Sequence, residues 1–204
     1  MNFDEKARDW DKDPGKIERS KIFAREIIEY TGGEKLQKAL EFGSGTGLAS
    51  FHLKDAFKSI TLADTSEGML EVLKEKISNE KINNMTPVLI DASRGLSGLE
   101  GFDIIFTLLV LHHVKDLDRI FADFYSSLNP GGIIFIGDLI TEDGSFHYKD
   151  PEFDGYLGFN PEELRDQLSA KGFEMDTEKI FYTIQREHNS VRKEYPLFLI
   201  AGKK

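Results

Sequence analysis

Short apolar runs alternate along the chain with longer segments whose apolar positions follow helical spacing. The runs predict strands, because a strand buried on both faces is apolar almost throughout; they cover residues 36–42, 59–63, 86–90, 102–110 and 133–139. The other segments predict helices, which cover residues 17–30, 48–57, 67–78, 117–128 and 160–171. Alternating strands and helices indicate an α/β fold with a mostly parallel sheet and helices on both faces.

Two later segments depart from this alternation. Residues 141–159 are rich in glycine, aspartate and aromatic residues without a clear period, and long irregular loops of this kind often bind ligands or act as lids. Asn160-Pro161-Glu162 carries the signals of a helix start, and Gly172 ends that helix. Residues 179–184 and 195–201 are apolar and too close together for a helical crossover. They predict an antiparallel hairpin at the edge of the sheet.

Composition narrows the class of protein. The 204 residues fit one domain, and their formal net charge is -10. A nucleic-acid-binding surface needs an excess of cations, so an acidic chain favours a small-molecule ligand, although Arg186, Arg192 and Lys193 could form a local basic patch. The chain has no cysteine, which excludes disulfides, thiolate zinc sites and a cysteine nucleophile. Without a long apolar run or a secretory signal, we expect a cytoplasmic protein with no membrane span.

A glycine-rich turn follows the first predicted strand, in the segment Glu41-Phe42-Gly43-Ser44-Gly45-Thr46-Gly47. Such a turn lets a ligand approach the backbone closely, and the next helix directs its N-terminus at that ligand. A plain strand-to-helix turn is the alternative, but three glycines at alternate positions exceed what a turn requires. The dinucleotide fingerprint G-x-G-x-x-G does not fit, because Gly47 comes one position early and Leu48 stands where that fingerprint has glycine or alanine.

Five linked motifs in one order resemble the class I S-adenosylmethionine-dependent methyltransferases. The turn is similar to their E/D-x-G-x-G-x-G motif, and an acid follows each of the next two predicted strands, at Asp64 and Asp91. The remaining motifs are Thr65-Ser66-Glu67-Gly68-Met69-Leu70, Leu111-His112-His113-Val114 and Leu128-Asn129-Pro130-Gly131-Gly132. They match best the small-molecule branch that includes ubiquinone and menaquinone biosynthesis. Linked motifs are far more specific than one glycine loop. The resemblance implies a Rossmann-like, doubly wound seven-stranded sheet with an antiparallel last strand.

The resemblance also implies S-adenosylmethionine as the cofactor. The glycines of the turn would let the backbone pass close to its methionine and ribose parts. Glu41 would lie near its amino group, and Asp64 would accept both ribose hydroxyls, since the two oxygens of a carboxylate suit a vicinal diol. Met69 would pack on the adenine, and Asp91 with the Ala92 backbone N–H would bind the edge of that ring. The expected cofactor-binding residues are Trp10, Glu41, Phe42, Gly43, Ser44, Gly45, Gly47, Asp64, Thr65, Met69, Asp91, Ala92 and Thr107.

These assignments have structural alternatives. Asp64 and Asp91 could cap the helices that follow them. Met69 has helical spacing with Leu70 and could belong to the core. Trp10, which the resemblance places in an N-terminal cover over the site, could instead anchor the first helix.

His112 and His113 follow the fourth predicted strand, where a doubly wound sheet places its ligand crevice. A histidine there could deprotonate a substrate hydroxyl or amine, because its pKa lies near neutrality. It could equally orient the loop or cap the next helix. Asp138, at the end of the fifth strand, could join either histidine as a polar group in the crevice. The insertion adds candidate substrate contacts, or else is a packed surface loop: His147, Tyr148, Asp154 and Tyr156.

We therefore predict one methyltransferase domain over residues 1–204 that methylates a small-molecule acceptor and releases S-adenosylhomocysteine. Its expected parts are an N-terminal cover and helix (1–33), a cofactor-binding core (34–140), a substrate-side insertion (141–159), and a last helix with a terminal hairpin (160–204). The alternatives are a nicotinamide-dependent oxidoreductase and a non-catalytic S-adenosylmethionine-binding module. We find no metal-ligand spacing such as H-E-x-x-H and expect no metal. Nucleic acid is not an expected partner, and a homodimer is left open.

Overall fold

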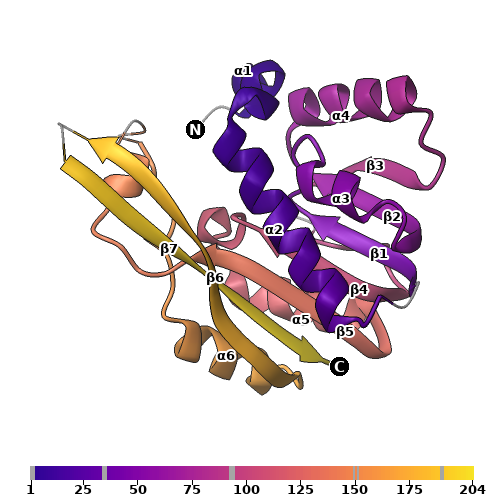
Figure 1. The fold of residues 1–204 in the computed structure, drawn as a ribbon. Coiled ribbons are helices and arrows are strands. Elements are labelled where there is room, and N and C mark those ends of the chain that lie inside the picture. The colour runs from indigo at the N-terminus through magenta and orange to yellow at the C-terminus, as the bar shows by residue number, and fades with distance from the viewer. Residues whose placement is uncertain (1–2, 34–35, 92–94, 149, 151, 189–190) are drawn as a thin grey trace.

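Seven strands of the described residues form one mixed sheet, in the order β3-β2-β1-β4-β5-β7-β6 (Figure 1). The computed structural model describes residues 3–33, 36–91, 95–148, 150, 152–188 and 191–204. The strands are β1 (Leu36–Phe42), β2 (Phe57–Asp64), β3 (Met85–Leu89), β4 (Phe102–Leu108), β5 (Leu128–Leu139), β6 (Glu174–His188) and β7 (Val191–Lys203). Neighbours from β3 to β5 are parallel, whereas β7 runs antiparallel to both β5 and β6. The predicted sheet with its reversed last strand is confirmed.

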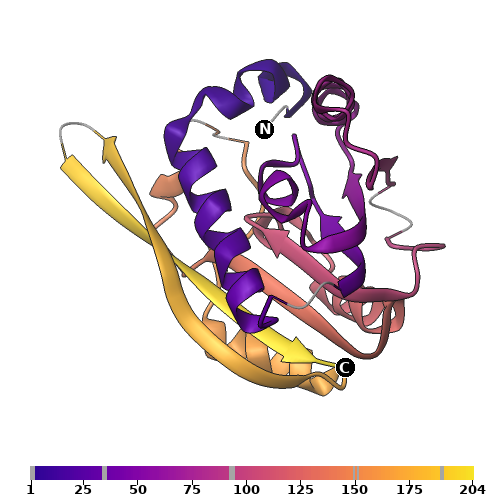
Figure 2. The same cartoon turned by 45° about the vertical axis from the view of Figure 1, so that its right-hand side comes forward.

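Helices cover both faces of this sheet (Figures 1 and 2). They are α1 (Phe3–Lys6), α2 (Pro14–Tyr30), α3 (Leu48–Leu53), α4 (Glu67–Glu80), α5 (Leu117–Ser127) and α6 (Pro161–Ala170), with the 3-10 turns η1 (Ala7–Lys12), η2 (Leu111–His113) and η3 (Ser145–His147). One buried core joins α2, α3 and α4 to the sheet through Phe23, Leu53 and Leu73. A second core on the other face joins α5 and α6 through Phe124 and Leu164. In the described part of the chain, no helix is long and apolar enough to cross a membrane.

The predicted helix over residues 48–57 is shorter in the structure. It ends at Leu53, and Phe57 is the first residue of β2. The N–H of Ala56 donates to the carbonyl of Leu53 in the turn between them. Leu53 and Phe57 are both buried and lie four residues apart, which is helical spacing. For this reason the hydrophobic pattern predicted a helix that continued to Phe57.

Two predicted boundaries near the site also differ. The fourth strand ends at Leu108 rather than at residue 110, because Leu109 takes a left-handed conformation with φ +58°. That conformation is uncommon for a residue with a side chain, and it turns the chain into η2. The fifth strand begins at Leu128, so the predicted turn at 129–132 lies within β5 as an irregularity in its pairing with β4. The terminal hairpin is longer than predicted at both strands.

The insertion at residues 141–159 contains one 3-10 turn, η3, and is closed at its base by the pairing of Ile140 with Phe159. The N–H of Thr141 donates to the carbonyl of Phe159 at 3.0 Å. The insertion therefore leaves the sheet after β5 and returns to the same place before α6. The candidate substrate residues lie between these two points.

Candidate active site

One cavity of about 1010 Å³ lies at the carboxyl ends of β1, β2 and β4. Volumes on the order of 300–1,000 Å³ are typical of small-molecule sites, and the carboxyl ends of parallel strands are where such folds bind ligands. Residues of α1, η1 and α2 form one wall, and residues of η2, η3 and β6 form another. The N-terminal segment, the sheet and the insertion thus enclose a single space.

The three glycines of the turn after β1 have different tasks. All have positive φ: +71° for Gly43, +52° for Gly45 and +80° for Gly47. A Cβ on Gly43 would lie 2.3 Å from a methyl carbon of Val110, and one on Gly47 would lie 2.7 Å from a methyl carbon of Leu73. Gly43 and Gly47 are therefore required for packing. Gly45 lines the cavity, and a Cβ built on it would have its nearest neighbour, Met69 Sδ, at 3.9 Å. The side that a side chain would occupy is therefore open to a ligand.

Asp64 ends β2 beside this turn and lines the same cavity. Its carboxylate accepts the Gly45 N–H at 2.6 Å and the Ser66 N–H at 2.8 Å. Burial raises the pKa of Asp64, and the backbone hydrogen bonds oppose that shift. Each carboxylate oxygen keeps a second lone pair, so Asp64 can still accept hydroxyl groups from a ligand. Asp64 does not cap α4, because the N-cap is Ser66, whose Oγ accepts the Met69 N–H; Asp64 instead bonds the backbone on both sides of the site and faces the cavity.

Glu41 is a buried acid at the end of β1. Its carboxylate accepts the hydroxyl of Ser50, and the side chain lines the cavity with only 4% of its surface exposed. Burial raises its pKa to about 8. At neutral pH Glu41 is therefore mostly protonated, and a cation placed beside it would favour the ionised form.

Most of the predicted cofactor-binding residues line this cavity. They are Trp10, Glu41, Phe42, Gly43, Ser44, Gly45, Asp64, Thr65 and Met69. Three others do not reach its surface: Gly47 packs on Leu73, Thr107 is buried in β4, and Asp91 is exposed. Ile90, the residue before Asp91, does line the cavity. Ala92 lies outside the described residues.

Two buried hydroxyls stand close to this region without a partner. Ser44 Oγ and Thr107 Oγ1 make no hydrogen bond to any described residue. Buried polar atoms are nearly always satisfied, so an unsatisfied one at a cavity indicates that a ligand or water completes its bonding. Ser44 lines the cavity directly.

A histidine and an aspartate form a buried pair on the opposite side of the cavity. His112 Nδ1 lies 2.6 Å from Asp138 Oδ1, and the two side chains are 2% and 0% exposed. Asp138 is fixed in turn, because it accepts the backbone N–H groups of Leu139 at 2.8 Å and of His112 at 3.3 Å. When a carboxylate accepts the hydrogen bond of the Nδ1–H group, Nε2 of the neutral ring carries no proton. The lone pair of Nε2 can then accept a proton or a hydrogen bond. The structure thus joins Asp138 to His112 rather than to His113.

His113 and His147 complete a group of three imidazoles. Burial lowers the pKa of His113 to about 3 and that of His147 to about 4, and the neighbouring His112 adds to both shifts. Both rings are therefore neutral at physiological pH. The sequence did not indicate this grouping, because His147 lies 34 positions after His113 in a loop without periodicity. The three rings meet because the path of the insertion places η3, which carries His147, beside η2.

The other predicted substrate residues are divided between two places. Tyr148 lines the large cavity with His147. Tyr156 instead lines a separate cavity of about 470 Å³ near the start of α5 and α6. Its N–H donates to the carbonyl of His112 at 2.8 Å, so it supports η2 from outside. Asp154 is exposed and pairs with Lys115.

A group of cations that the sequence pattern does not indicate lies along the cavity wall. Lys6, Lys16, Arg19 and Arg186 all line it. Burial lowers the pKa of Arg19 to about 10 and also lowers the pKa of Lys16. Arg186 lies 3.8 Å from the Phe146 ring and donates to the Phe146 carbonyl at 2.6 Å. Of the basic residues considered for nucleic acid, Arg186 lines this cavity, whereas its cross-strand partner Lys193 pairs with Asp143. The cations of this wall favour a ligand with negative charge.

Comparisons with known proteins agree with this fold. Residues 40–134 match the family model described as a methyltransferase domain. An uncharacterised methyltransferase of Schizosaccharomyces pombe is 32% identical over 117 residues, which are 53% of this chain and 40% of that protein. A ubiquinone/menaquinone biosynthesis C-methyltransferase of Shewanella sediminis is 28% identical over 188 residues, 80% of this chain and 75% of that protein. The chain spans about half the length, or less, of the first curated relatives that it matches.

A solved structure supports the fold. A putative methyltransferase of Bacillus halodurans superposes with a TM-score of 0.75 at 14% identity, covering 89% of this chain and 98% of that one. The fold is Rossmann-like, as in that solved structure. The domain match and the relatives confirm the resemblance to class I S-adenosylmethionine-dependent methyltransferases that the motifs indicate.

Proposed function

We propose that this protein transfers a methyl group from S-adenosylmethionine to a small-molecule acceptor and releases S-adenosylhomocysteine. The observation that carries this proposal is the shared cavity. The glycine turn and Asp64 line one side of it, and the pair of His112 with Asp138 lies at the other. A cofactor held by the first group would direct its reactive end at the second.

The residues present fit this cofactor. The open backbone at Gly45 and the unsatisfied hydroxyl of Ser44 offer the close approach and the hydrogen bond that a polar ligand needs. Asp64 would accept the ribose hydroxyls. Glu41 would meet the amino group, whose positive charge would shift this acid toward its ionised form. Trp10 and Met69 would cover the adenine. When bound, the cofactor supplies a methyl group on a positively charged sulfur.

The acceptor side supports a simple displacement. The bound cofactor would supply the methyl group, and the residues at this end of the cavity would align the acceptor atom with it. An acceptor hydroxyl or amine would release its proton to Nε2 of His112. Asp138 would hold that ring in the required tautomer and stabilise the imidazolium that forms. Burial of the cavity would exclude water and leave alignment as the main contribution to the rate.

Equilibrium binding provides the first test. We expect calorimetric binding of S-adenosylhomocysteine and none of NADH, because the spacing of the turn departs from the dinucleotide fingerprint. Binding of NADH without any response to S-adenosylhomocysteine would establish the oxidoreductase alternative.

A screen of small-molecule acceptors, read out as release of S-adenosylhomocysteine, then tests turnover. We expect the His112→Ala variant to bind the cofactor as the natural protein does and to lose roughly 10²- to 10⁴-fold in kcat, the usual contribution of a general base. Cofactor binding with no turnover on any acceptor would instead support the binding module. The single-domain boundaries and the cytoplasmic location stay predictions, and sedimentation would establish whether the protein is a monomer or a homodimer.

A further inference from the structure

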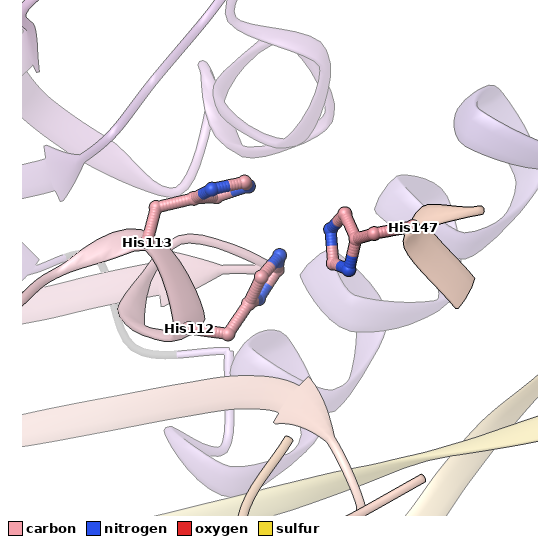
Figure 3. Close-up of side chains that lie close together, drawn as sticks. All are labelled: His112, His113 and His147. Atoms are coloured by element: carbon pink, nitrogen blue, oxygen red, sulfur yellow. The ribbon is translucent and has the colours of Figure 1, made fainter. Parts of the chain in front are cut away.

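Three histidine rings face one another at the acceptor end of the cavity (Figure 3). His112 and His113 come from η2, and His147 comes from η3 in the insertion. The centroid of the His112 ring lies 4.2 Å from that of His113 and 5.2 Å from that of His147, and the last two centroids are 5.6 Å apart. One nitrogen from each ring lies within 4.8 Å of the other two. Three potential ligand atoms therefore border one small volume.

His112 is oriented by a hydrogen bond from its ring to a carboxylate, as metal-binding histidines usually are. Its Nδ1 is bonded to Asp138, so Nε2 is the nitrogen that remains for a ligand. Metal-binding histidines almost always donate their other ring N–H to a carboxylate or carbonyl, which fixes the tautomer and makes the ligand nitrogen more basic. Asp138 is wholly buried and held by two backbone N–H groups, so it can impose this orientation.

His147 carries an unexplained polar atom. Its Nδ1 is buried and makes no hydrogen bond to any residue that the structure describes. Its ring is stacked on Phe153, with centroids 3.7 Å apart and planes within 3° of parallel. The stacking fixes the plane of the imidazole but satisfies neither nitrogen. A buried nitrogen without a partner needs an ion or a water to complete it.

His113 is held by aromatic contacts alone. Its ring meets Phe3 edge-on at 5.3 Å and Phe153 edge-on at 5.4 Å. Within the described chain, its side chain has no hydrogen bond. All three rings are thus fixed in place by groups outside the cluster, while each has a nitrogen directed to the space between them.

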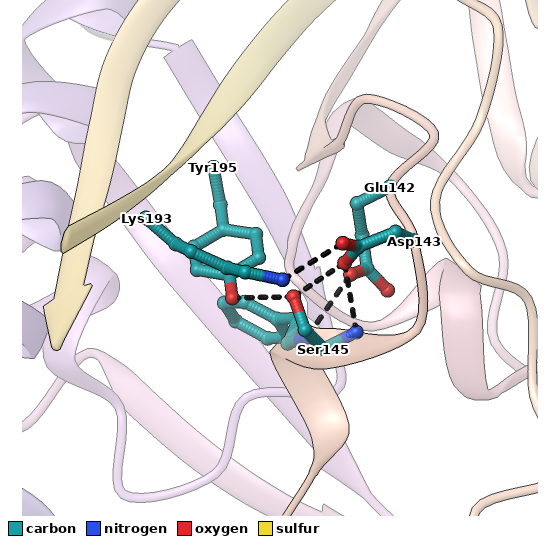
Figure 4. Close-up of polar contacts among 6 residues, drawn as sticks. Glu142, Asp143, Ser145, Lys193 and Tyr195 are labelled. Atoms are coloured by element: carbon teal, nitrogen blue, oxygen red, sulfur yellow. Dashed lines mark hydrogen bonds and ion pairs between the residues drawn. The ribbon is translucent and has the colours of Figure 1, made fainter. Parts of the chain in front are cut away.

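The segment that carries His147 is tied to the sheet (Figure 4). Ser145 Oγ lies 2.8 Å from the hydroxyl of Tyr195 on β7, and Lys193 Nζ lies 2.7 Å from Asp143 Oδ2. The Phe146 N–H donates to Glu142 Oε2 at 3.0 Å. The first two bonds tie the insertion to β7, and the third lies within the insertion. Together they hold His147 at a defined place although it comes from an irregular loop.

We infer that His112, His113 and His147 form a binding site for a divalent transition-metal ion of the zinc type. Imidazole nitrogens suit zinc, iron, nickel and copper, whereas magnesium and calcium require oxygen ligands. Ligand nitrogens lie about 2.0–2.1 Å from zinc, so tetrahedral coordination would place them about 3.4 Å apart. The three nitrogens now lie within 4.8 Å of one another, so binding would draw the rings together by about an ångström or slightly more. Three protein ligands leave one coordination position open toward the cavity.

The role of such an ion rests on the proposed function, but its binding does not. Coordination would use the same Nε2 lone pair of His112 that would otherwise accept the acceptor's proton. The ion would therefore replace His112 in that task. An acceptor oxygen or nitrogen bound at its open position would lose its proton more readily, because a bound cation lowers the pKa of a coordinated group.

Binding of Zn²⁺ to the full chain, freed of any purification tag and of metal, tests this inference. We expect one Zn²⁺ per chain by calorimetry and elemental analysis, and Co²⁺ should give the visible spectrum of a tetrahedral site. His113→Gln and His147→Gln should each abolish the Co²⁺ spectrum. Asp138→Asn should weaken Zn²⁺ affinity by about 10- to 100-fold, as loss of a supporting carboxylate does elsewhere. His52→Gln is the matched control, because His52 is an exposed histidine of α3 outside the cluster and should change nothing.

Each outcome decides one point. If Zn²⁺ binding is absent, or is equal in the natural protein, His113→Gln and His147→Gln, the metal site is overturned. S-adenosylhomocysteine binding, measured on the same samples, reports whether the cofactor side is folded in every variant. Its loss in the natural protein would overturn the proposed function while leaving a measured metal site intact.

Discussion

The two sides of the cavity are assembled in different ways. Apart from Trp10, the cofactor side is built from residues close in sequence, between Glu41 and Met69, and its geometry depends on backbone conformation at the glycine turn. The acceptor side combines η2, the end of β5, η3 and Arg186 of β6, which are distant in the sequence. Local backbone geometry therefore defines one side, and tertiary packing of side chains defines the other.

Burial acts on the two sides with opposite chemical consequences. On the cofactor side it raises the pKa of Glu41 to about 8 and that of Asp64 above its ordinary value. On the acceptor side it lowers the pKa of His113 to about 3 and that of His147 to about 4. In both cases the neutral form is favoured, because removing a charge from water is costly. The acids thus respond to a ligand cation, whereas the histidines offer lone pairs at neutral pH.

The largest effect should come from Gly43→Ala on the cofactor side. The new Cβ would clash with Val110 at 2.3 Å, and φ at +71° disfavours any side chain. We expect a loss of about 2–5 kcal/mol in the free energy of unfolding, from the backbone strain and the overpacking together. Chemical denaturation followed by circular dichroism measures this change.

Gly98→Ala is the matched control for that variant. Gly98 has φ +84° but no atom within 4 Å of the position that its Cβ would take. It should therefore lose only the backbone part, about 1–2 kcal/mol. Equal destabilisation of the two variants would show that the contact between the turn and Val110 does not matter for folding.

Asp64→Asn should weaken binding of S-adenosylhomocysteine by about 10- to 100-fold. Hydrogen bonds to a charged group contribute roughly 1.5–3 kcal/mol, and an amide presents only one acceptor oxygen. Calorimetry measures the affinity. Ser66→Ala separates ligand binding from helix capping, because Ser66 Oγ accepts the Met69 N–H at the start of α4. That variant should lose stability but not affinity. If Asp64→Asn loses stability but not affinity, Asp64 only supports the glycine turn and is not a ribose ligand.

The cofactor side could be predicted from the sequence because its signals are local. Three glycines at alternate positions, followed by Asp64 at the end of the next strand, predicted the turn and its neighbouring acid. The mostly parallel sheet followed from the alternating patterns, and its antiparallel edge followed from the short connection before β7. The predicted end of the helix at Phe57 was wrong because one hydrophobic pattern fits two structures. Phe57 has helical spacing from Leu53, but it belongs to β2.

The acceptor side could be predicted only in part. His112 and Asp138 each stand at a strand end, which suggested that they meet, but nothing in the sequence chose His112 over His113. The convergence of His147 with them depends on the path of the insertion. The contribution of Arg19 and Arg186 to one wall depends on the packing of α2 and β6 around the cavity. Neither the convergence of the histidines nor the shared wall of the two arginines produces a periodic pattern or a fixed spacing in the sequence.

Glu41→Gln should remove a pH dependence of stability. Because the pKa of Glu41 rises from 4.5 to about 8 on folding, the folded chain keeps a proton that the unfolded chain releases between these values. The stabilisation is complete below about pH 4.5 and is lost as the pH rises toward 8. Between pH 6 and pH 7 the natural protein should lose about 1.4 kcal/mol through this group. Denaturation at the two pH values should show a smaller loss in Glu41→Gln. The exposed residue Glu71 supplies the control, and Glu71→Gln should keep the full loss.

The smallest effect should follow Tyr195→Phe, which tests how firmly the acceptor side is held. The variant removes the hydroxyl that lies 2.8 Å from Ser145 Oγ and leaves the buried ring in place. One such bond contributes about 0.5–1.5 kcal/mol, so hydrogen exchange of residues 142–148 should quicken by roughly 2- to 10-fold. Tyr182→Phe is the control, since its hydroxyl bonds Glu18 at 3.2 Å on another part of the hairpin. Exchange at the glycine turn should not change in either variant. Faster exchange there after Tyr195→Phe would mean that the two sides are coupled and do not form independently.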